Sequence, residues 1–401
     1  MTELAPAPAP GSSHLMGTYG MAGVRFSEGR GAFLYDDQGK EYLDFLSGIA
    51  VTSLGHSNPV VGDAVILQAK RLWHVSNLFQ NELAEPLAAG LDELVGDGRR
   101  AGGKVFFANS GAEANECAIK LARRHGGRGR YGVVSAYGSF HGRSLATLHA
   151  TGQPEKHEPF QPLPEGFSHV AYGDVGALEA ALDPNVVSAV LLEAIQGENG
   201  VVVPPAGYVA AVRALCDERG ILLILDEVQT GLGRTWRWFG FQHDDVRPDI
   251  VTVAKALGNG MPVGACWARA EVASAFRPGD HGSTFGGQPL ACSAALATLG
   301  ELRRIDAPAR SARLGQHLGR LLVEVEGIAS VRGRGLLLGA VLEGVAALRA
   351  KEVVAAALGL GLVVNSPVPG VIRLAPPLTV EADEIERGAG LLARAIEEVA
   401  P

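Results

Sequence analysis

Residues 249–265 read DIVTVAKALGNGMPVGA and place a charged side chain at the end of a strand-like apolar run. Ile250, Val251 and Val253 are β-branched residues, which favour a buried strand. Lys255 closes the run, directly before a glycine-rich segment. Most such lysines extend their long side chain out to water. The alternative is a reactive amine whose pKa is lowered by its surroundings, and the rest of the sequence has to distinguish the two.

Similar apolar runs recur through the middle of the chain and alternate with helical stretches. They lie at residues 104–108, 131–136, 187–194 and 221–227. The stretch 205–220 has apolar residues at helical spacing and ends at Gly220, as a helix would. This alternation predicts an α/β fold, with a mostly parallel central sheet that carries helices on both faces.

With 401 residues, the chain is too long for one simple core. We expect a disordered Pro/Ala-rich tail at 1–16, and a segment at 17–75 that joins the small domain. A large α/β domain should follow at 76–285, and a smaller α+β domain at 286–401. Within the second segment, the DDQGK motif at 36–40 predicts the turn of a β-hairpin.

Composition excludes several classes of protein. The formal net charge of −8 argues against nucleic acid as a partner. No apolar run is long enough to span a membrane, and the first residues do not have the pattern of a secretory signal. The cysteines form no CxxC pair and the histidines no HExxH motif, so we expect a reduced, cytoplasmic protein without a metal. The four cysteines are Cys117, Cys216, Cys266 and Cys292.

The run at 104–108 leads into a predicted helix through Ser110, Gly111 and Ala112. Ser110 can cap this helix, and Glu113 can complete a capping box. The free N–H groups of a helix N-terminus can also bind a phosphate, and Gly111 would allow a close approach. Both interpretations can hold together, because a capped helix still has N–H groups to offer.

The polar face of that helix carries Glu116 and Lys120, four residues apart. Opposite charges at this spacing can form an ion pair on a helix surface. We therefore expect the two side chains to pair.

Asp226 and Glu227 end the apolar run at 221–227, where a buried carboxylate needs a partner. That partner could be a salt-bridging side chain, a helix cap or a cationic ring nitrogen of a ligand. Lys255 follows after about one strand–helix–strand unit, so Asp226 and Lys255 can lie at neighbouring strand ends. A phosphate site, a carboxylate for a ring nitrogen and a nucleophilic lysine together predict a pyridoxal 5′-phosphate site.

The sequence resembles the class III, ornithine-type, pyridoxal phosphate-dependent aminotransferases from about residue 17 to the C-terminus. The resemblance is carried by blocks that occur in order along the chain. They include LDFLSGIAVTSLGH (43–56), FFANSGAEANECAIKLAR (106–123), SFHGRSLATLHATGQP (139–154), DEVQTGLGRT (226–235), HGSTFGGQPLAC (281–292) and IRLAPPL (372–378). This resemblance implies the fold-type I architecture of these transferases.

The resemblance also implies roles for residues around the cofactor. Lys255 looks like the lysine that joins the cofactor's aldehyde and moves the substrate proton, and Asp226 like the partner of the pyridine nitrogen. The other expected cofactor contacts are Ser110, Gly111, Ala112, Phe140, Glu227, Val228, Gln229 and Thr284. Thr284 would reach the phosphate from the partner subunit, which implies a homodimer with shared active sites.

Four residues are similar to those that bind substrate in the family. Arg143 would meet a substrate carboxylate, and Ser283 would lie beside the substrate. Arg373 would anchor the α-carboxylate of glutamate or 2-oxoglutarate, because a guanidinium binds a carboxylate through two hydrogen bonds. Glu198 would pair with Arg373 when the other substrate is bound.

The implied reaction transfers the δ-amino group of N2-acetylornithine to 2-oxoglutarate in two stages, as in arginine biosynthesis. Ornithine, acetyllysine, succinyldiaminopimelate and 4-aminobutyrate are alternative donors, and an aminomutase or a catalytically silent cofactor-binding protein are alternatives of other classes. Three residues depart from the family pattern: Asn199 and Trp236 stand where glycine is common, and Gln288 where asparagine is usual. None of these departures removes a catalytic group.

Overall fold

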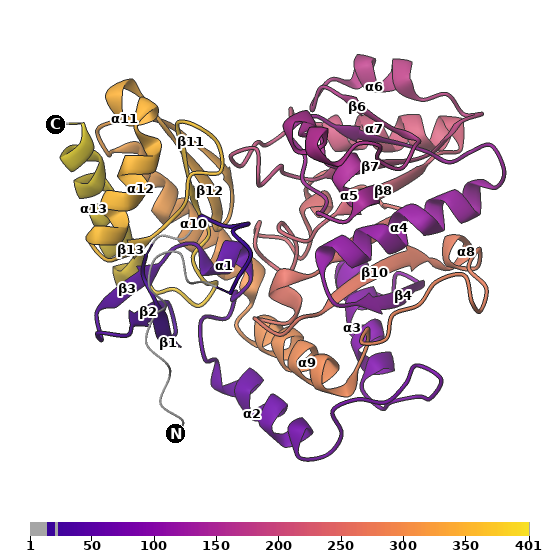
Figure 1. Cartoon of the computed structure of the whole chain (residues 1–401), viewed down its shortest axis with the longest axis horizontal. Helices are drawn as coiled ribbons and strands as arrows, with labels where there is room; N and C mark the ends of the chain where they lie inside the picture. Colours follow the sequence, from indigo (N-terminus) through magenta and orange to yellow (C-terminus); the bar gives the residue numbers. More distant parts are fainter. Residues whose placement is uncertain (1–13, 21–22, 401) are drawn as a thin grey trace.

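The computed structural model describes residues 14–20 and 23–400, so most of the predicted tail at 1–16 lies outside the described residues. Figure 1 shows two lobes, one built around a large sheet and the other around two smaller sheets with helices α10 to α13. The predicted division into domains, with boundaries after residues 16, 75 and 285, stays a prediction. No helix of the described chain is long and apolar enough to cross a membrane.

The larger lobe contains a seven-stranded sheet, and β10 is the one strand of it that runs antiparallel to its neighbours. The prediction of a mostly parallel sheet is therefore confirmed. In spatial order the strands are β4 (Gly103–Ala108), β10 (Gly264–Arg269), β9 (Ile250–Val253), β8 (Leu222–Asp226), β7 (Val187–Glu193), β5 (Gly132–Ala136) and β6 (Phe167–Val170).

Strand β8 explains why the sheet has helices on both faces. Leu223 and Leu225 belong to one buried apolar cluster, whereas Ile224 between them belongs to another. Because side chains alternate along a strand, each face of the sheet needs its own apolar cover. The helices of this lobe are α3 (Ala84–Val95), α4 (Gly111–Gly126), α5 (Leu145–Ala150), α6 (Val175–Ala181), α7 (Tyr208–Arg219) and α8 (Ala270–Ala273).

The smaller lobe combines both ends of the chain. In one of its sheets β13 (Leu362–Val363) pairs in parallel with β3 (Glu41–Asp44), while β3 also pairs with β2 (Phe33–Asp36) in the predicted hairpin. Strand β1 (Phe26–Arg30) completes that sheet. The other elements here are β11 (Ile328–Arg334), β12 (Leu337–Leu342), β14 (Val371–Leu374), α10 (Ala307–Val323), α11 (Gly344–Leu348), α12 (Ala350–Gly359) and α13 (Ala382–Val399).

Further helices link the lobes. Helix α9 begins the predicted C-terminal domain, yet it packs against α2 and α3. Helix α10 follows α9 after a short turn. The linking and short elements are α1 (Ser47–Ala50), α2 (Pro59–Ala69), α9 (Pro289–Arg304) and the 3₁₀ turns η1 (Pro154–Lys156), η2 (Glu158–Phe160), η3 (Gly240–His243) and η4 (Lys255–Leu257).

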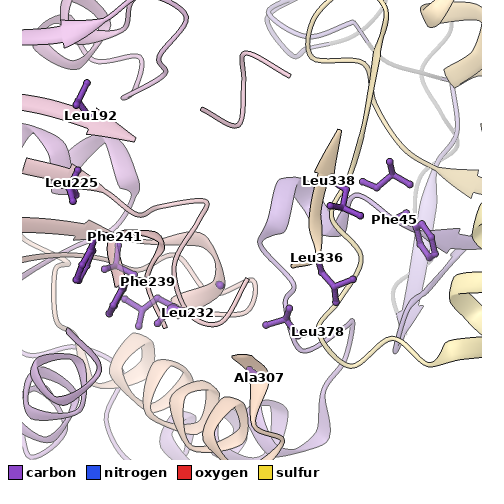
Figure 2. Packing of buried hydrophobic residues seen from close by; sticks show 14 of the residues in the cluster. Phe45, Leu192, Leu225, Leu232, Phe239, Phe241, Ala307, Leu336, Leu338 and Leu378 are labelled. Carbon is purple, nitrogen blue, oxygen red and sulfur yellow. The ribbon is translucent and has the colours of Figure 1, made fainter. Parts of the chain in front are cut away.

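One buried arginine joins the two lobes. Arg234, in the loop after β8, is fully buried and donates hydrogen bonds to the Leu336 carbonyl (3.0 Å), the Pro376 carbonyl and Ser53 Oγ (2.8 Å). Burial lowers the pKa of this guanidinium to about 9. Leu336, Leu378 and the larger lobe's Leu232 belong to one buried apolar cluster, and Figure 2 shows Leu336 and Leu378 on the opposite side of the view from Leu232.

Two local predictions were wrong. Helix α7 begins at Tyr208 rather than at 205, because Gly207 adopts the left-handed conformation (φ 77°) that precedes it. Glu116 and Lys120 do not pair. The Glu116 carboxylate accepts hydrogen bonds from Ser144 and Thr147, and the Lys120 ammonium donates to the carbonyl of Asp280.

Candidate active site

The carboxyl ends of five strands of the large sheet surround one cavity of about 350 Å³. Each strand contributes a residue at or just beyond its end. These residues are Asn109 after β4, Phe140 after β5, Glu193 on β7, Asp226 on β8 and Lys255 after β9. Parallel strands bring such residues to the same edge, where ligands of open α/β sheets bind.

Lys255 lies in this cavity in an unusual state. Its backbone is left-handed (φ 45°), which is costly for a residue with a side chain and is typical of functional sites. Within the described chain its ammonium has no hydrogen-bond or ion-pair partner. Burial lowers the pKa of Lys255 to about 8, with a further lowering by Arg373, while Glu198 and Asp226 oppose the shift. Lys255 is therefore not a lysine that reaches out to water.

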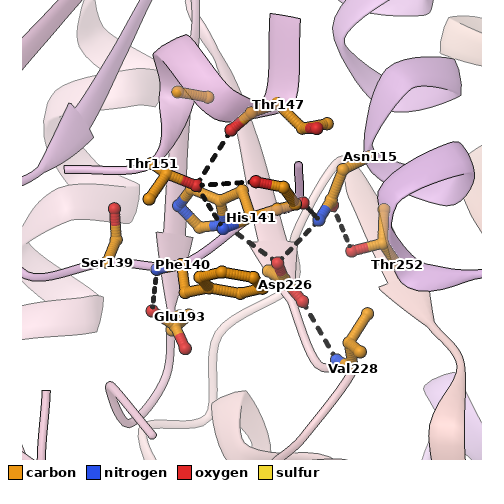
Figure 3. A network of polar contacts seen from close by, with 12 residues as sticks. Asn115, Ser139, Phe140, His141, Thr147, Thr151, Glu193, Asp226, Val228 and Thr252 are labelled. Carbon is orange, nitrogen blue, oxygen red and sulfur yellow. Dashed lines mark hydrogen bonds and ion pairs between the residues drawn. The ribbon is translucent and has the colours of Figure 1, made fainter. Parts of the chain in front are cut away.

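Asp226 lies on the neighbouring strand and is 4% exposed. Its Oδ2 lies 2.8 Å from His141 Nδ1 and accepts a hydrogen bond from Asn115 Nδ2 at 2.7 Å. Oδ1 accepts the backbone N–H of Val228 at 3.0 Å. Figure 3 shows Asp226, His141 and Asn115 meeting above the ring of Phe140 in that view. The contacts hold the carboxyl group in one orientation at the edge of the cavity.

Asn115 is itself fixed by contacts on both sides of its amide. Its Oδ1 accepts a hydrogen bond from Thr252 Oγ1 (2.7 Å), and its Nδ2 also donates to the His141 carbonyl (2.8 Å). The amide must therefore present its NH₂ group to Asp226, which makes the Asp226 oxygen an acceptor. His141 is buried, and its Nε2 has no partner among the described residues.

The other end of the cavity is the N-terminus of α4. Ser110 Oγ accepts the N–H of Glu113 (3.2 Å), as predicted for a cap, but the Glu113 carboxylate turns to the N–H of Asn109 (2.9 Å) and does not complete a capping box. The N–H groups of Gly111 and Ala112 have no acceptor within the described chain. These groups and the helix dipole form a site for an anion.

Gly111 has no room for a side chain. A Cβ at this position would lie 2.8 Å from Cγ1 of Val228, which itself lines the cavity. A glycine here keeps the space next to the free N–H groups open, so a phosphate can come close.

Glu193 and Phe140 form another wall. The Glu193 carboxyl group accepts N–H groups of Phe140 (3.1 Å) and Gly197 (3.4 Å), and burial raises its pKa well above the usual value. The guanidinium carbon of Arg143 lies 5.6 Å from the centre of the Phe140 ring. Arg143 is exposed at the cavity's edge, which makes it available to a substrate.

Residues 18–396 match the family model described as aminotransferase class-III. The chain belongs to the class-III aminotransferases. This class-III aminotransferase is 46% identical to the acetylornithine aminotransferase of Methanothermobacter thermautotrophicus, over 96% of the chain and 97% of that protein. It is 48% identical to the acetylornithine aminotransferase of Mycobacterium tuberculosis, over 93% and 91%.

Solved structures of aminotransferases superpose on this chain as well. The ornithine aminotransferase of Toxoplasma gondii superposes with a TM-score of 0.90 at 35% identity, covering 96% of this chain and 93% of that one. The acetylornithine aminotransferase of Elizabethkingia anophelis gives a TM-score of 0.84 at 32% identity, covering 96% of each chain. This class-III aminotransferase therefore has the fold-type I architecture that its sequence implied.

Most of the predicted site residues of this class-III aminotransferase line the one cavity, and four do not. Those that line it are Ser110, Gly111, Ala112, Phe140, Arg143, Glu198, Asp226, Val228, Gln229 and Lys255. Glu227 was expected at the cofactor but points elsewhere: its carboxyl group accepts the N–H groups of Gly240 and Phe241, both at 2.9 Å. It holds η3 in place instead.

Ser283 and Thr284 also lie outside the cavity of their own chain. Ser283 accepts a hydrogen bond at its Oγ from Asn109 (3.2 Å), a residue that does line the cavity. Thr284 is exposed. The expected contribution of Thr284 to a partner's site stays a prediction.

Arg373 lies behind the cavity, fully buried, and its Nη1 is 2.5 Å from Glu198 Oε1. Its Nε donates to Asn365 Oδ1 (3.1 Å), whereas Nη2 has no partner among the described residues. Burial opposes ionisation of Glu198, but the Arg373 guanidinium lowers the pKa of Glu198 overall. Glu198, which lines the cavity, is thus paired with Arg373, while the expected change of this pair with the bound substrate stays a prediction.

Sequence reasoning missed His141, Asn115 and Glu193. His141 stands inside the quoted SFHGR motif and Asn115 follows the predicted phosphate loop, so both were close to residues that were chosen. Their partners come from other strands. The sequence did offer a signal for two of them. His141 and Asn115 are polar residues that follow strands whose ends were predicted to lie at the cavity.

Proposed function

We propose that this chain is a pyridoxal 5′-phosphate-dependent aminotransferase that moves the δ-amino group of N2-acetylornithine to 2-oxoglutarate. The observation that carries the proposal is the position of Lys255 and Asp226 at adjacent strand ends, in one cavity with a helix N-terminus that can bind a phosphate. Near full-length similarity to acetylornithine aminotransferases of several organisms supports the choice of donor.

The residues of the cavity fit this cofactor. The α4 N-terminus would hold the phosphate, Asp226 the pyridine nitrogen, and Phe140 and Val228 the two ring faces. When bound, pyridoxal phosphate supplies an aldehyde that takes up the amino group and a ring that withdraws electrons from the reacting carbon. Lys255, with its lowered pKa, would carry the proton at Nζ between the substrate carbon and the cofactor.

Arg373 and Glu198 would let one site accept two different substrates. When Glu198 binds Arg373, the carboxylate neutralises the charge of the buried guanidinium. The site can then accept the δ-amino end of N2-acetylornithine. When Glu198 moves away, Arg373 can bind the α-carboxylate of 2-oxoglutarate through two hydrogen bonds. Arg143, exposed at the rim, would bind a further substrate carboxylate.

A homodimer with shared sites is part of the proposal. Ser283 and Thr284 follow β10 and α8 in a segment that is partly exposed in the single chain. In the dimer, Thr284 would complete the phosphate site of the partner subunit. The products would be N-acetylglutamate 5-semialdehyde and glutamate, which places the enzyme in arginine biosynthesis.

A panel of amino donors tests the donor. Each of N2-acetylornithine, ornithine, acetyllysine, succinyldiaminopimelate and 4-aminobutyrate is supplied with 2-oxoglutarate, and glutamate formation is followed. We expect the highest kcat/KM with N2-acetylornithine. Ornithine is the second candidate, because the Toxoplasma gondii structure is that of an ornithine aminotransferase. A higher kcat/KM with another donor would overturn the choice of substrate but leave the reaction class.

A variant tests the reaction class itself. Lys255→Ala should abolish turnover with every donor, since no other lysine lines the cavity in the described chain. After borohydride reduction, mass spectrometry should find the cofactor attached to the wild-type protein and not to the variant. Full activity of Lys255→Ala would refute the mechanism.

A further inference from the structure

A second, larger hollow lies on the opposite side of the β11–β12 hairpin from the active site's residues 197–200. Its volume is about 1010 Å³, and it is lined by α10, β11 and Trp236. Its apolar wall includes Ala309, Ala312, Val323, Val331 and Leu338. We call it the α10 groove. None of the roles proposed above uses it.

The charges of the α10 groove are unbalanced. Four arginines line it, Arg313, Arg320, Arg332 and Arg334, against one carboxylate, Glu324. Arg313, Arg320 and Arg334 have no ion pair within the described residues, and Glu324 does not pair with Arg320 although it lies four positions on. Three unpaired guanidiniums around one hollow favour a ligand with several negative charges, because each can offer two hydrogen bonds to a phosphate.

Trp236 gives the groove a flat aromatic surface. Its side chain is 40% exposed, and its ring meets that of His243 edge-on at 5.0 Å. Its backbone is left-handed (φ 60°), a strained conformation for a bulky residue at a position where glycine would fit without strain. Strain that is kept at an exposed aromatic residue indicates a use for that side chain. An indole of this kind can stack on a planar ring.

Arg332 connects the groove to the active site. Its Nε donates to the Gly200 carbonyl at 2.7 Å and its Nη2 to the Asn199 carbonyl at 3.4 Å, next to Glu198. In the sheet, Arg332 lies opposite Gly339, and Gly339 lies opposite Arg373. The Arg332 side chain lies on the active-site face of β11, while Val331 on the other face lines the groove. A ligand that shifts β11 from the groove side would therefore loosen the contacts of Arg332 with both carbonyls and bias the position of Glu198 on Arg373.

We propose that the α10 groove binds a small phosphorylated molecule that carries a planar ring, and that its binding changes the affinity of the active site for 2-oxoglutarate. The phosphates lie against Arg313, Arg320 and Arg334, and the ring lies against Trp236. Coupling through Arg332 acts in both directions, because a ligand that favours one arrangement of residues 198–200 is itself favoured by it.

Calorimetry with the cofactor-loaded enzyme tests the binding. ADP, pyrophosphate and adenosine serve as probes, and the bound cofactor keeps the α4 N-terminus from taking their phosphates. We expect ADP to bind more tightly than pyrophosphate, and pyrophosphate more tightly than adenosine. The affinity for ADP should fall as salt is raised, because the contacts are made by exposed charges.

The double variant Arg313→Gln/Arg320→Gln should weaken ADP binding at least tenfold. Arg394→Gln is the matched control, since Arg394 is an exposed arginine outside the groove, and it should bind ADP as the wild type does. Thermal unfolding without ligand should be the same for all three proteins. Trp236→Ala should weaken ADP binding and leave pyrophosphate binding unchanged.

The coupling is measured separately, as the KM for 2-oxoglutarate with and without saturating ADP. We expect a shift of at least twofold in the wild type and none in the double variant. No ADP binding to the wild type at millimolar concentration, or equal binding by the folded double variant, would overturn the site. An unchanged KM would overturn the coupling. Since calorimetry needs no turnover, these results do not depend on which donor the enzyme uses.

Discussion

The unusual state of Lys255 has a physical cause that its sequence neighbours do not reveal. Its pKa is lowered mainly by burial, and the cavity that buries it is assembled from five strand ends. The apolar run before Lys255 was enough to place it at a strand end. The left-handed backbone and the lack of a partner depend on the folded cavity, so the sequence could suggest a reactive lysine without deciding for it.

This pKa sets the pH dependence of cofactor uptake. Below about pH 8 the amine is mostly protonated and cannot attack an aldehyde, so the uptake rate should rise with pH and level off above about 8. An ordinary lysine, with a pKa of 10.5, would give a rate that still rises at pH 9. Stopped-flow absorbance of apoenzyme mixed with pyridoxal phosphate measures this. A profile still climbing at pH 10 would contradict the assignment.

His141 is expected to position Asp226 rather than to react. His141→Ala removes the contact at 2.8 Å and leaves a buried carboxyl group short of a donor, which costs about 1.5–3 kcal/mol for a hydrogen bond to a charged group. We expect kcat/KM to fall by roughly 10- to 100-fold. His141→Asn keeps an N–H donor at the position of Nδ1 and should recover part of the loss. Equal losses in both variants would argue against this role.

At the scale of elements, the positions of the strands along the chain were easier to predict than the pairing of the strands in the sheet. The runs that became β5, β7, β8 and β9 were recognisable because strands buried on both faces are continuous apolar stretches. The antiparallel insertion of β10 between β4 and β9 was not predicted, since pairing across the sheet is a long-range property.

Helix α4 shows the same limit for polar contacts. The cap at Ser110 was predicted correctly, whereas the partners of the polar side chains were not. Glu116 and Lys120 take partners from the segments at 144–147 and 280–281, which lie far away in sequence. Exposed ion pairs contribute little energy, so better acceptors from elsewhere in the fold can replace them.

The N-terminus of α4 gives a test at this scale. Gly111→Ala would place a methyl group 2.8 Å from Val228 Cγ1 and narrow the space in front of the free N–H groups. We expect pyridoxal phosphate to bind at least about tenfold more weakly, which equilibrium dialysis measures. Ala112→Gly, which only removes a methyl group beside it, is the control and should bind the cofactor nearly as the wild type does. Wild-type affinity in Gly111→Ala would exclude a phosphate at this helix end.

At the scale of the whole molecule, the proposed dimer can be tested by mixing inactive subunits. A subunit carrying Lys255→Ala keeps Thr284, and a subunit carrying Thr284→Ala keeps Lys255. If Thr284 acts across the interface, a mixed dimer has one fully native site, and refolding the two variants together should restore activity above that of either alone. If Thr284 acts within its own chain, mixing restores nothing.

The contacts of Arg234 bear on how this enzyme could be rebuilt. One guanidinium from the loop after β8 ends on acceptors contributed by three segments of the other lobe, near residues 53, 336 and 376. A chimera that takes one lobe from a relative must therefore keep a matching set of hydrogen-bond acceptors. Without them, the guanidinium would be buried between the lobes with no partner. For the same reason, we expect that the two halves of the chain, produced separately, do not fold well on their own and fold only when they are mixed.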